Sequence, residues 1–197
     1  MVFFRPAPPI PMNPFLISVA AVALAEIGDK TQLLSLLLAA RYRKPVPIIV
    51  GILLSTLLNH ALAALVGEWI GRALGPDAIR WGVGISFLAI ALWTLKPDKL
   101  DENDAAKSHG SVFIITFVAF FLAEMGDKTQ VATVLLAAKF HALYAVVLGT
   151  TVGMMIANVP AVLLGKAAAD RIPFQAVRLV AAGLFALLGA AALVTGG

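Results

Sequence analysis

Cysteine is absent from the 197-residue sequence, which excludes disulfide bonds, thiolate metal ligands and thiol chemistry. Charged residues are scarce as well: they make up 13% of the chain, whereas a soluble domain averages about 25%. No basic stripe with interleaved aromatic residues is present, so nucleic acid is not an expected partner. The composition therefore argues against an ordinary soluble protein.

Hydrophobic residues make up 60% of the chain, and the mean hydropathy is +0.94. About 20 apolar residues cross a hydrocarbon layer of about 30 Å as a helix. Apolar runs bounded by charged, proline or glycine residues predict six such helices, at 15–40, 46–70, 81–95, 111–138, 143–164 and 177–194. The predicted fold class is an all-α integral membrane protein with six transmembrane helices and a turn at 71–80.

An octapeptide occurs twice, at residues 25–32 and 123–130, with seven of its eight positions identical. Other matches keep the same offset of 98, such as Gly51 with Gly149 and Phe87 with Phe185. Three spans per half is an odd number, so the halves are predicted to be inverted-topology repeats, as in many secondary transporters. The predicted organisation is a proline-rich lead-in (1–14), a three-helix repeat (15–95), a polar linker (96–110) and a second three-helix repeat (111–197).

Loop charges indicate how the chain lies in the membrane. Of the 15 Lys and Arg residues, two lie in the octapeptides, four on one predicted side and nine on the other. The positive-inside rule assigns the nine-charge side, which includes the 96–110 linker, to the cytoplasm. Both termini are then expected outside, in a multi-pass membrane protein.

Each octapeptide places a Glu and an Asp near the middle of a predicted span. Charges at that depth cost at least about 2.5–3.5 kcal/mol each, which favours a functional role. In a continuous helix, Glu26 and Asp29 share one face. Gly28 between them allows close backbone approach or local unwinding that frees carbonyl ligands. The equivalent residues of the second copy are Glu124, Asp127 and Gly126.

Inverted symmetry is expected to bring the two copies together at the middle of the membrane. The candidate metal ligands are the four carboxylates, Glu26, Asp29, Glu124 and Asp127. Supporting neutral oxygens come from Thr31, Gln32, Thr129 and Gln130. With Lys30 and Lys128 as balancing charges the site carries −2, which one divalent cation or two protons would neutralise. An all-oxygen site suits hard cations such as Ca²⁺, Mg²⁺ and Mn²⁺.

Three further polar residues lie in the other predicted spans. Asn59 and Asn158 are candidate supporting ligands, although an Asn in a span often only bonds a neighbouring helix. His60, and not Asn59, aligns with Asn158 at the offset of 98. We interpret His60 as a helix contact and not as a metal ligand, because no second His lies at ligand spacing.

The doubled pattern Glu-x-Gly-Asp-(Lys/Arg)-(Ser/Thr) in a small six-span chain resembles the Gdt-type calcium/manganese:proton antiporter family. The matching residues are Glu26, Gly28, Asp29, Lys30 and Thr31, and Glu124, Gly126, Asp127, Lys128 and Thr129. The resemblance covers residues 14–195 and implies export of Mn²⁺ or Ca²⁺ from the cytoplasm in exchange for protons. The short linker resembles compact bacterial members, which implies a bacterial inner membrane.

Alternative functions are weighed against this interpretation. Four acids could hold an ammonium group, so a cation channel or an exporter of a basic organic solute is the second candidate. An intramembrane aspartyl protease would use Asp29 and Asp127, but it needs a Tyr-Asp pair that the sequence lacks. A purely structural membrane subunit is the last alternative. We expect no enzyme activity and no resident cofactor; the expected partners are the lipid bilayer and divalent ions, with a homo-oligomer left open.

Because the chain has no native cysteine, single introduced cysteines report its topology without background. Ser108→Cys is expected to react with a membrane-impermeant maleimide only when the cytoplasmic face is accessible. Gly197→Cys is expected to react in intact cells. Labelling of Ser108→Cys from outside intact cells would reverse the assignment, and with it the direction of transport.

Overall fold

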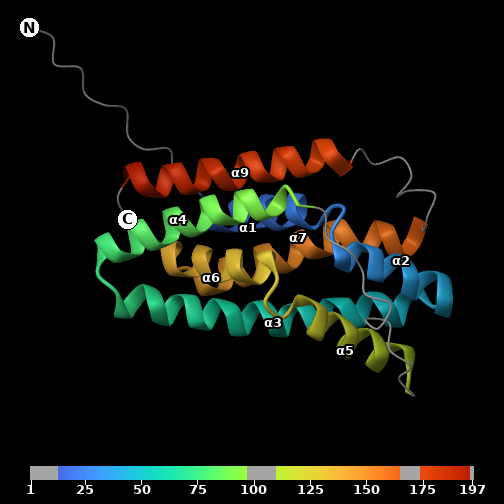
Figure 1. Ribbon diagram of the computed structural model, residues 1–197. Coiled ribbons are helices and arrows are strands. Elements are labelled where there is room, and N and C mark those ends of the chain that lie inside the picture. Colours follow the sequence, from blue (N-terminus) through green and yellow to red (C-terminus); the bar gives the residue numbers. More distant parts are fainter. Residues whose placement is uncertain (1–12, 97–109, 165–173, 196–197) are drawn as a thin grey trace, which may run out of the picture.

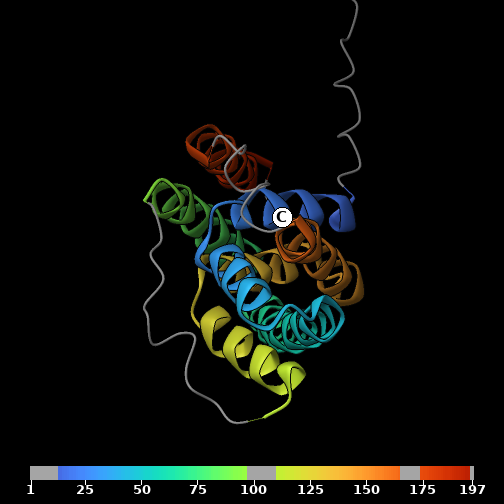
Figure 2. The same cartoon turned by 90° about the vertical axis from the view of Figure 1, so that its right-hand side faces the viewer.

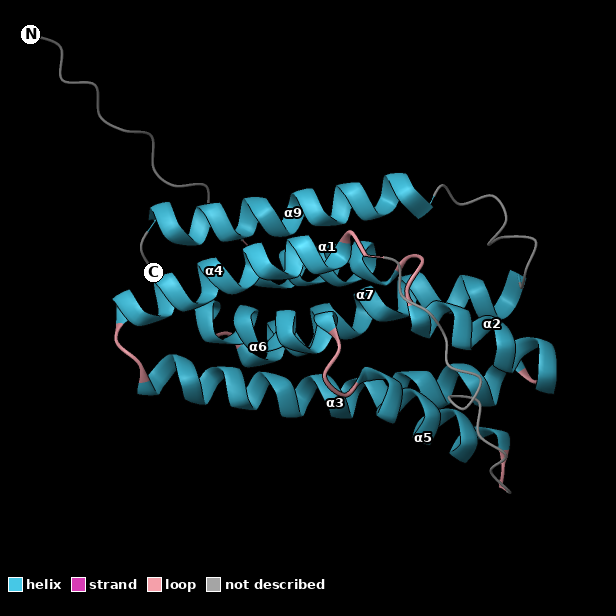
Figure 3. Cartoon of the chain, viewed as in Figure 1, coloured by secondary structure: helices cyan, strands magenta, loops and turns pink. Residues whose placement is uncertain are grey.

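The computed structural model describes residues 13–96, 110–164 and 174–195, and within them the chain is helical, with no strand (Figures 1 and 3). The helices are α1 (Pro14–Glu26), α2 (Lys30–Tyr42), α3 (Pro45–Ala73), α4 (Pro76–Thr94), α5 (Val112–Glu124), α6 (Lys128–Phe140), α7 (Leu143–Leu164) and α9 (Phe174–Thr195). Helices α3 and α9 run along the length of the bundle in Figure 1, and α9 and α5 lie at opposite edges of the bundle when it is seen from its end (Figure 2).

Among the described helices, three are long and apolar enough to cross a membrane: α3, α7 and the Gln175–Val194 part of α9. Large apolar side chains also face outward, including Leu62 (47% exposed), Leu92 (72%) and Leu187 (70%). So much exposed apolar surface is what a lipid-facing bundle requires and what a soluble protein avoids. The all-α prediction therefore agrees with the described chain, and its outer surface suits a membrane.

Two of the predicted spans are not continuous helices. The 15–40 segment is divided into α1 and α2, and the 111–138 segment into α5 and α6, each 13 residues long. Gly28 (φ 83°) and Gly126 (φ 76°) lie in the breaks, in the left-handed region that glycine enters without steric cost. The prediction that Glu26 and Asp29 share one helical face is wrong, because the backbone unwinds between them.

Other boundaries differ by smaller amounts. Helix α3 continues to Ala73 and α4 begins at Pro76, so the turn is much shorter than the predicted 71–80 segment. Pro76 occupies the first helical position, where the missing N–H costs nothing, and so α4 starts earlier than residue 81. Helix α7 has the predicted bounds. Nearly all of the predicted 1–14 and 96–110 segments lies outside the described residues.

Residues 98 positions apart make equivalent contacts. A Cβ added at Gly51 on α3 would lie 2.8 Å from Thr116 Cβ on α5. A Cβ added at Gly149 on α7 would likewise lie 2.8 Å from Ser18 Cβ on α1. The α3–α5 contact in one half is therefore repeated as the α7–α1 contact in the other.

The core also brings equivalent residues face to face. Phe87 on α4 and Phe185 on α9 are fully buried and stack with ring centroids 6.0 Å apart. They belong to one apolar cluster, and a second cluster contains Ile52 and Phe120. A residue and its equivalent at the offset of 98 therefore meet at this stack.

Close approach of α3 to α6 depends on Gly67. A Cβ at Gly67 would lie 2.2 Å from the backbone oxygen of Val134, which cannot move aside as a side chain can. Gly67→Ala is therefore expected to destabilise the protein by about 1–3 kcal/mol, measured by thermal unfolding in detergent. The control is Gly82→Ala on α4, where nothing lies within 4 Å. Equal melting temperatures of the two variants would contradict this packing.

Candidate metal centre

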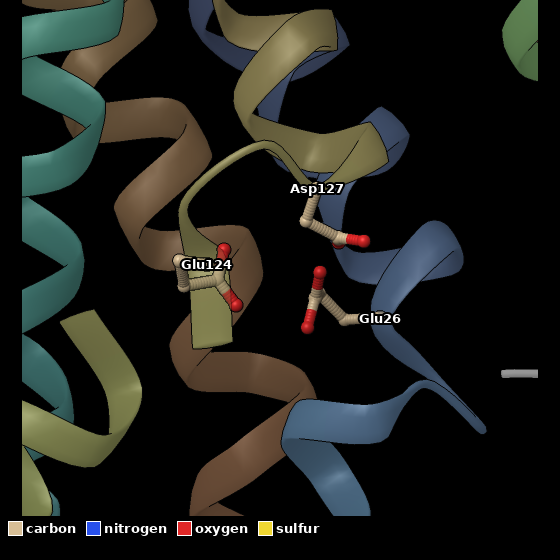
Figure 4. Close-up of side chains that lie close together, drawn as sticks. All are labelled: Glu26, Glu124 and Asp127. Carbon is tan, nitrogen blue, oxygen red and sulfur yellow. The ribbon is translucent and has the colours of Figure 1, made fainter. Parts of the chain in front are cut away.

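The two motif breaks bring three carboxylates together (Figure 4). Glu26 ends α1, Glu124 ends α5 and Asp127 precedes α6, and each offers an oxygen within 4.8 Å of the other two. We call these residues the three-carboxylate group. Their exposed fractions are 0%, 0% and 3%, so the group is shielded from solvent. Anionic oxygens this close and this buried repel one another unless a cation or protons are present.

Each glutamate of the group is oriented by a threonine of its own motif. Thr31 Oγ1 donates a hydrogen bond to Glu26 Oε2, and Thr129 Oγ1 donates one to Glu124 Oε2 at 3.1 Å. The other oxygen of each glutamate, Oε1, is buried without a hydrogen-bond partner among the described residues. A buried oxygen left unpaired is costly, which makes these two oxygens candidate ligand atoms.

The motif glutamines hold the helix breaks. Gln32 Oε1 accepts a hydrogen bond from the Gly28 N–H at 2.8 Å, and Gln130 Oε1 accepts one from the Gly126 N–H at 2.7 Å. Each amide thus ties the unwound residue to the first turn of the following helix. The side-chain oxygens of both glutamines are used for this purpose and not directed to the carboxylates.

The two asparagines make contacts between helices. Asn59 Nδ2 donates to the backbone oxygen of Phe121 at 3.0 Å, and Asn59 Oδ1 accepts from Gln130 Nε2 at 3.3 Å. Asn158 Oδ1 accepts from Ser35 Oγ at 2.6 Å. Neither asparagine belongs to the three-carboxylate group, so both stabilise the helices around it.

Asp29, the fourth predicted carboxylate, lies in an ion pair. Lys128 Nζ donates to Asp29 Oδ1, and Lys30 Nζ lies 4.0 Å from Asp127 Oδ1. The lysine of each motif therefore faces the aspartate of the other. The two lysines differ in exposure, since the Lys128 side chain is 4% exposed and the Lys30 side chain 25%. The structure thus gathers three of the four predicted carboxylates and places Asp29 beside a buried cation.

His60 is the residue whose position the sequence interpretation did not anticipate. Its Nε2 lies 4.0 Å from Glu124 Oε2, and the side chain is fully buried. The signal available in the sequence was its alignment with Asn158 at the offset of 98.

The buried Lys128–Asp29 pair is expected to contribute more to stability than the Lys30–Asp127 pair. Lys128→Gln should cost about 3–5 kcal/mol, because it removes a buried cation that balances Asp29. Lys30→Gln should cost clearly less, since that lysine is partly exposed and 4.0 Å from its partner. Thermal unfolding in detergent measures both. The double variant Asp29→Asn/Lys128→Gln should recover part of the stability lost in Lys128→Gln. Equal losses in Lys128→Gln and Lys30→Gln would contradict the larger contribution of the buried pair.

Comparison with known proteins shows the family. A model of the family "Divalent cation/proton antiporter GDT1" matches residues 14–102 and 112–197. The chain is 55% identical over 181 residues to a Vibrio cholerae protein named "Putative manganese exporter", covering 91% of this chain and 90% of that one. It is 30% identical to "GDT1-like protein sll0615" of Synechocystis (89% and 94% covered) and 31% identical to "GDT1-like protein 5" of Arabidopsis thaliana (90% and 94%).

No solved structure matches the chain significantly. The family consists of membrane transporters of divalent cations and not of enzymes, which excludes the aspartyl-protease alternative. The doubled motif, the apolar helices and the family match over both halves lead to one conclusion: the chain belongs to the GDT1 family of divalent cation/proton antiporters.

Proposed function

We propose that this protein exports a divalent cation, Mn²⁺ or Ca²⁺, from the cytoplasm in exchange for protons. The observation that carries the proposal is the three-carboxylate group, which is buried and draws its members from both halves of the chain. The family description supports protons as the counter-ion. The name of the Vibrio relative supports Mn²⁺ as cargo and export as direction.

Electrostatics supply the coupling between metal and protons. Two unit charges 4 Å apart repel by about 4 kcal/mol at the effective dielectric near a protein surface, and by more in a drier interior. The emptied, ionised group is therefore unfavourable, whereas a bound cation or bound protons relieve the repulsion. If the group changes its accessible side only when occupied, metal moving outward is linked to protons moving inward.

We further infer six membrane spans arranged as two inverted-topology repeats. A 13-residue helix is about 20 Å long, so α1 and α2 together form one interrupted span, and α5 and α6 form another. The chain runs left to right through α1 and α2 in Figure 1, and right to left through α5 and α6. Interrupted helices that carry ion ligands at the membrane midplane are a recurring construction of secondary transporters.

The orientation in the membrane rests on the loop charges. The four-to-nine asymmetry of Lys and Arg supports a cytoplasmic 96–110 linker and external termini. The bacterial relative supports an inner-membrane location. In this orientation, α2 and α7 end at the cytoplasmic side and α3 ends at the external side.

The compactness of the three-carboxylate group distinguishes the candidate substrates. Its ligand atoms lie within 4.8 Å of one another, a span that suits a single ion better than an organic ammonium compound. This favours a metal ion over a basic organic solute. Whether the protein exchanges or conducts the ion is decided by the counter-flux of protons.

Glu26→Gln and Glu124→Gln each remove one charge while nearly keeping shape. In proteoliposomes with an imposed pH gradient, each variant is expected to reduce Mn²⁺ flux at least about tenfold, as loss of metal-site groups commonly does. Acidifying the metal-loading side should weaken Mn²⁺ uptake by the unaltered protein, because protons and metal compete for the same oxygens.

The matched control is Glu68→Gln, which alters a glutamate paired with Arg72 at the end of α3, away from the group. Its flux should equal that of the unaltered protein. Proton movement is recorded with a pH-sensitive dye in the same vesicles. Metal flux that ignores pH on both sides, with no opposing proton flux, would identify a uniporter or channel and refute exchange.

A further inference from the structure

His60 is buried in the middle of α3 in an environment that does not satisfy it. Its side chain is 0% exposed, and neither ring nitrogen has a hydrogen-bond partner within the described part of the chain. A buried polar group without a partner is costly, so its presence calls for a ligand or another explanation. The ring adjoins the three-carboxylate group at Glu124.

The side chain of the equivalent residue in the other half does have hydrogen-bond partners. Asn158 accepts a hydrogen bond from Ser35 Oγ at 2.6 Å, and its Nδ2 donates to the Met154 backbone oxygen at 3.1 Å. Packing between the helices at this position is thus achieved by a satisfied amide in one half. The unsatisfied imidazole in the other half is not required by that packing, which indicates a role specific to the first half.

The distance from His60 to Glu124 suits a shared ion. Two atoms that each lie about 2.1 Å from one octahedral cation are about 3–4.2 Å apart. Glu124 Oε2, which accepts a hydrogen bond from Thr129 and keeps a second lone pair for an ion, lies 4.0 Å from His60 Nε2. That separation is within the range and too long for a hydrogen bond. Neutral imidazole presents one nitrogen lone pair, and a cation held by Glu124 is a group that this lone pair can coordinate.

We propose that His60 is a nitrogen ligand of the transported ion and makes the site selective for first-row transition metal ions, Mn²⁺ included, over Ca²⁺ and Mg²⁺. The inference rests on the proposed function of the three-carboxylate group. Carboxylate oxygens alone bind Ca²⁺, Mg²⁺ and Mn²⁺ alike, whereas imidazole nitrogen is a poor ligand for Ca²⁺ and Mg²⁺. One nitrogen among oxygens therefore separates the two classes of ion.

Electron spin echo spectroscopy of Mn²⁺ bound to the purified full-length protein tests the ligand directly. The unaltered protein should show ¹⁴N modulation from a coordinated imidazole, and protein labelled with ¹⁵N-histidine should show the ¹⁵N pattern in its place. His60→Asn, which installs the residue of the other half, should lose the modulation. Its Mn²⁺ affinity should fall about tenfold or more, while its Ca²⁺ affinity stays within about twofold.

His141→Asn is the matched control, since His141 is exposed at the end of α6 and its left-handed backbone suits asparagine. This variant should keep the modulation and the selectivity. His60→Gln and the isotope-labelled protein keep the test decisive if His60→Asn does not fold.

Mn²⁺ bound to the unaltered protein without ¹⁴N modulation would overturn the inference and leave the proposed function intact. Unchanged modulation in His60→Asn would overturn it equally. If Mn²⁺ does not bind the unaltered protein, or binds equally well to Glu26→Gln, the carboxylate site itself fails, and His60 ligation fails with it.

Discussion

The need to balance negative charge away from water governs this structure. Each motif carries two carboxylates into the interior and only one lysine. Lys128 contacts Asp29 and Lys30 faces Asp127, so each half depends on the other for a cation. The halves are therefore joined by ion pairs beside the candidate site, and a charge change in one motif alters the charge balance of the other.

The helical character of the chain was predictable because its signals are local. Long apolar runs predict helices, and the constant offset of 98 predicts which helices correspond. The C-terminal caps of α2 and α6 keep the same offset of 98: Arg43 and His141 both end their helices in the left-handed conformation. The helix breaks were not predictable, because Gly28 in an apolar run is compatible with a continuous helix and with an unwound one.

The candidate site was only partly predictable, for a different reason. Residue types and depth indicated a cation site, and Glu26, Glu124 and Asp127 were named from them. The sequence could not show that Asp29 pairs with Lys128, because that choice depends on which motif the lysine faces in three dimensions. Nor could spacing show that His60 adjoins Glu124, since 64 positions separate them and no second His marks the contact.

The hydrogen bonds from Gly28 and Gly126 to the motif glutamines bear on how fast and how selectively an ion could bind. Both unwound segments are held by side-chain amides of Gln32 and Gln130. If an ion binds at the three-carboxylate group as proposed, the backbone there would not have to unwind when the ion arrives or rewind when it leaves. Preorganisation of this kind removes an ordering cost from every cycle. An ion of the wrong size would then meet a backbone with limited freedom to collapse or expand around it.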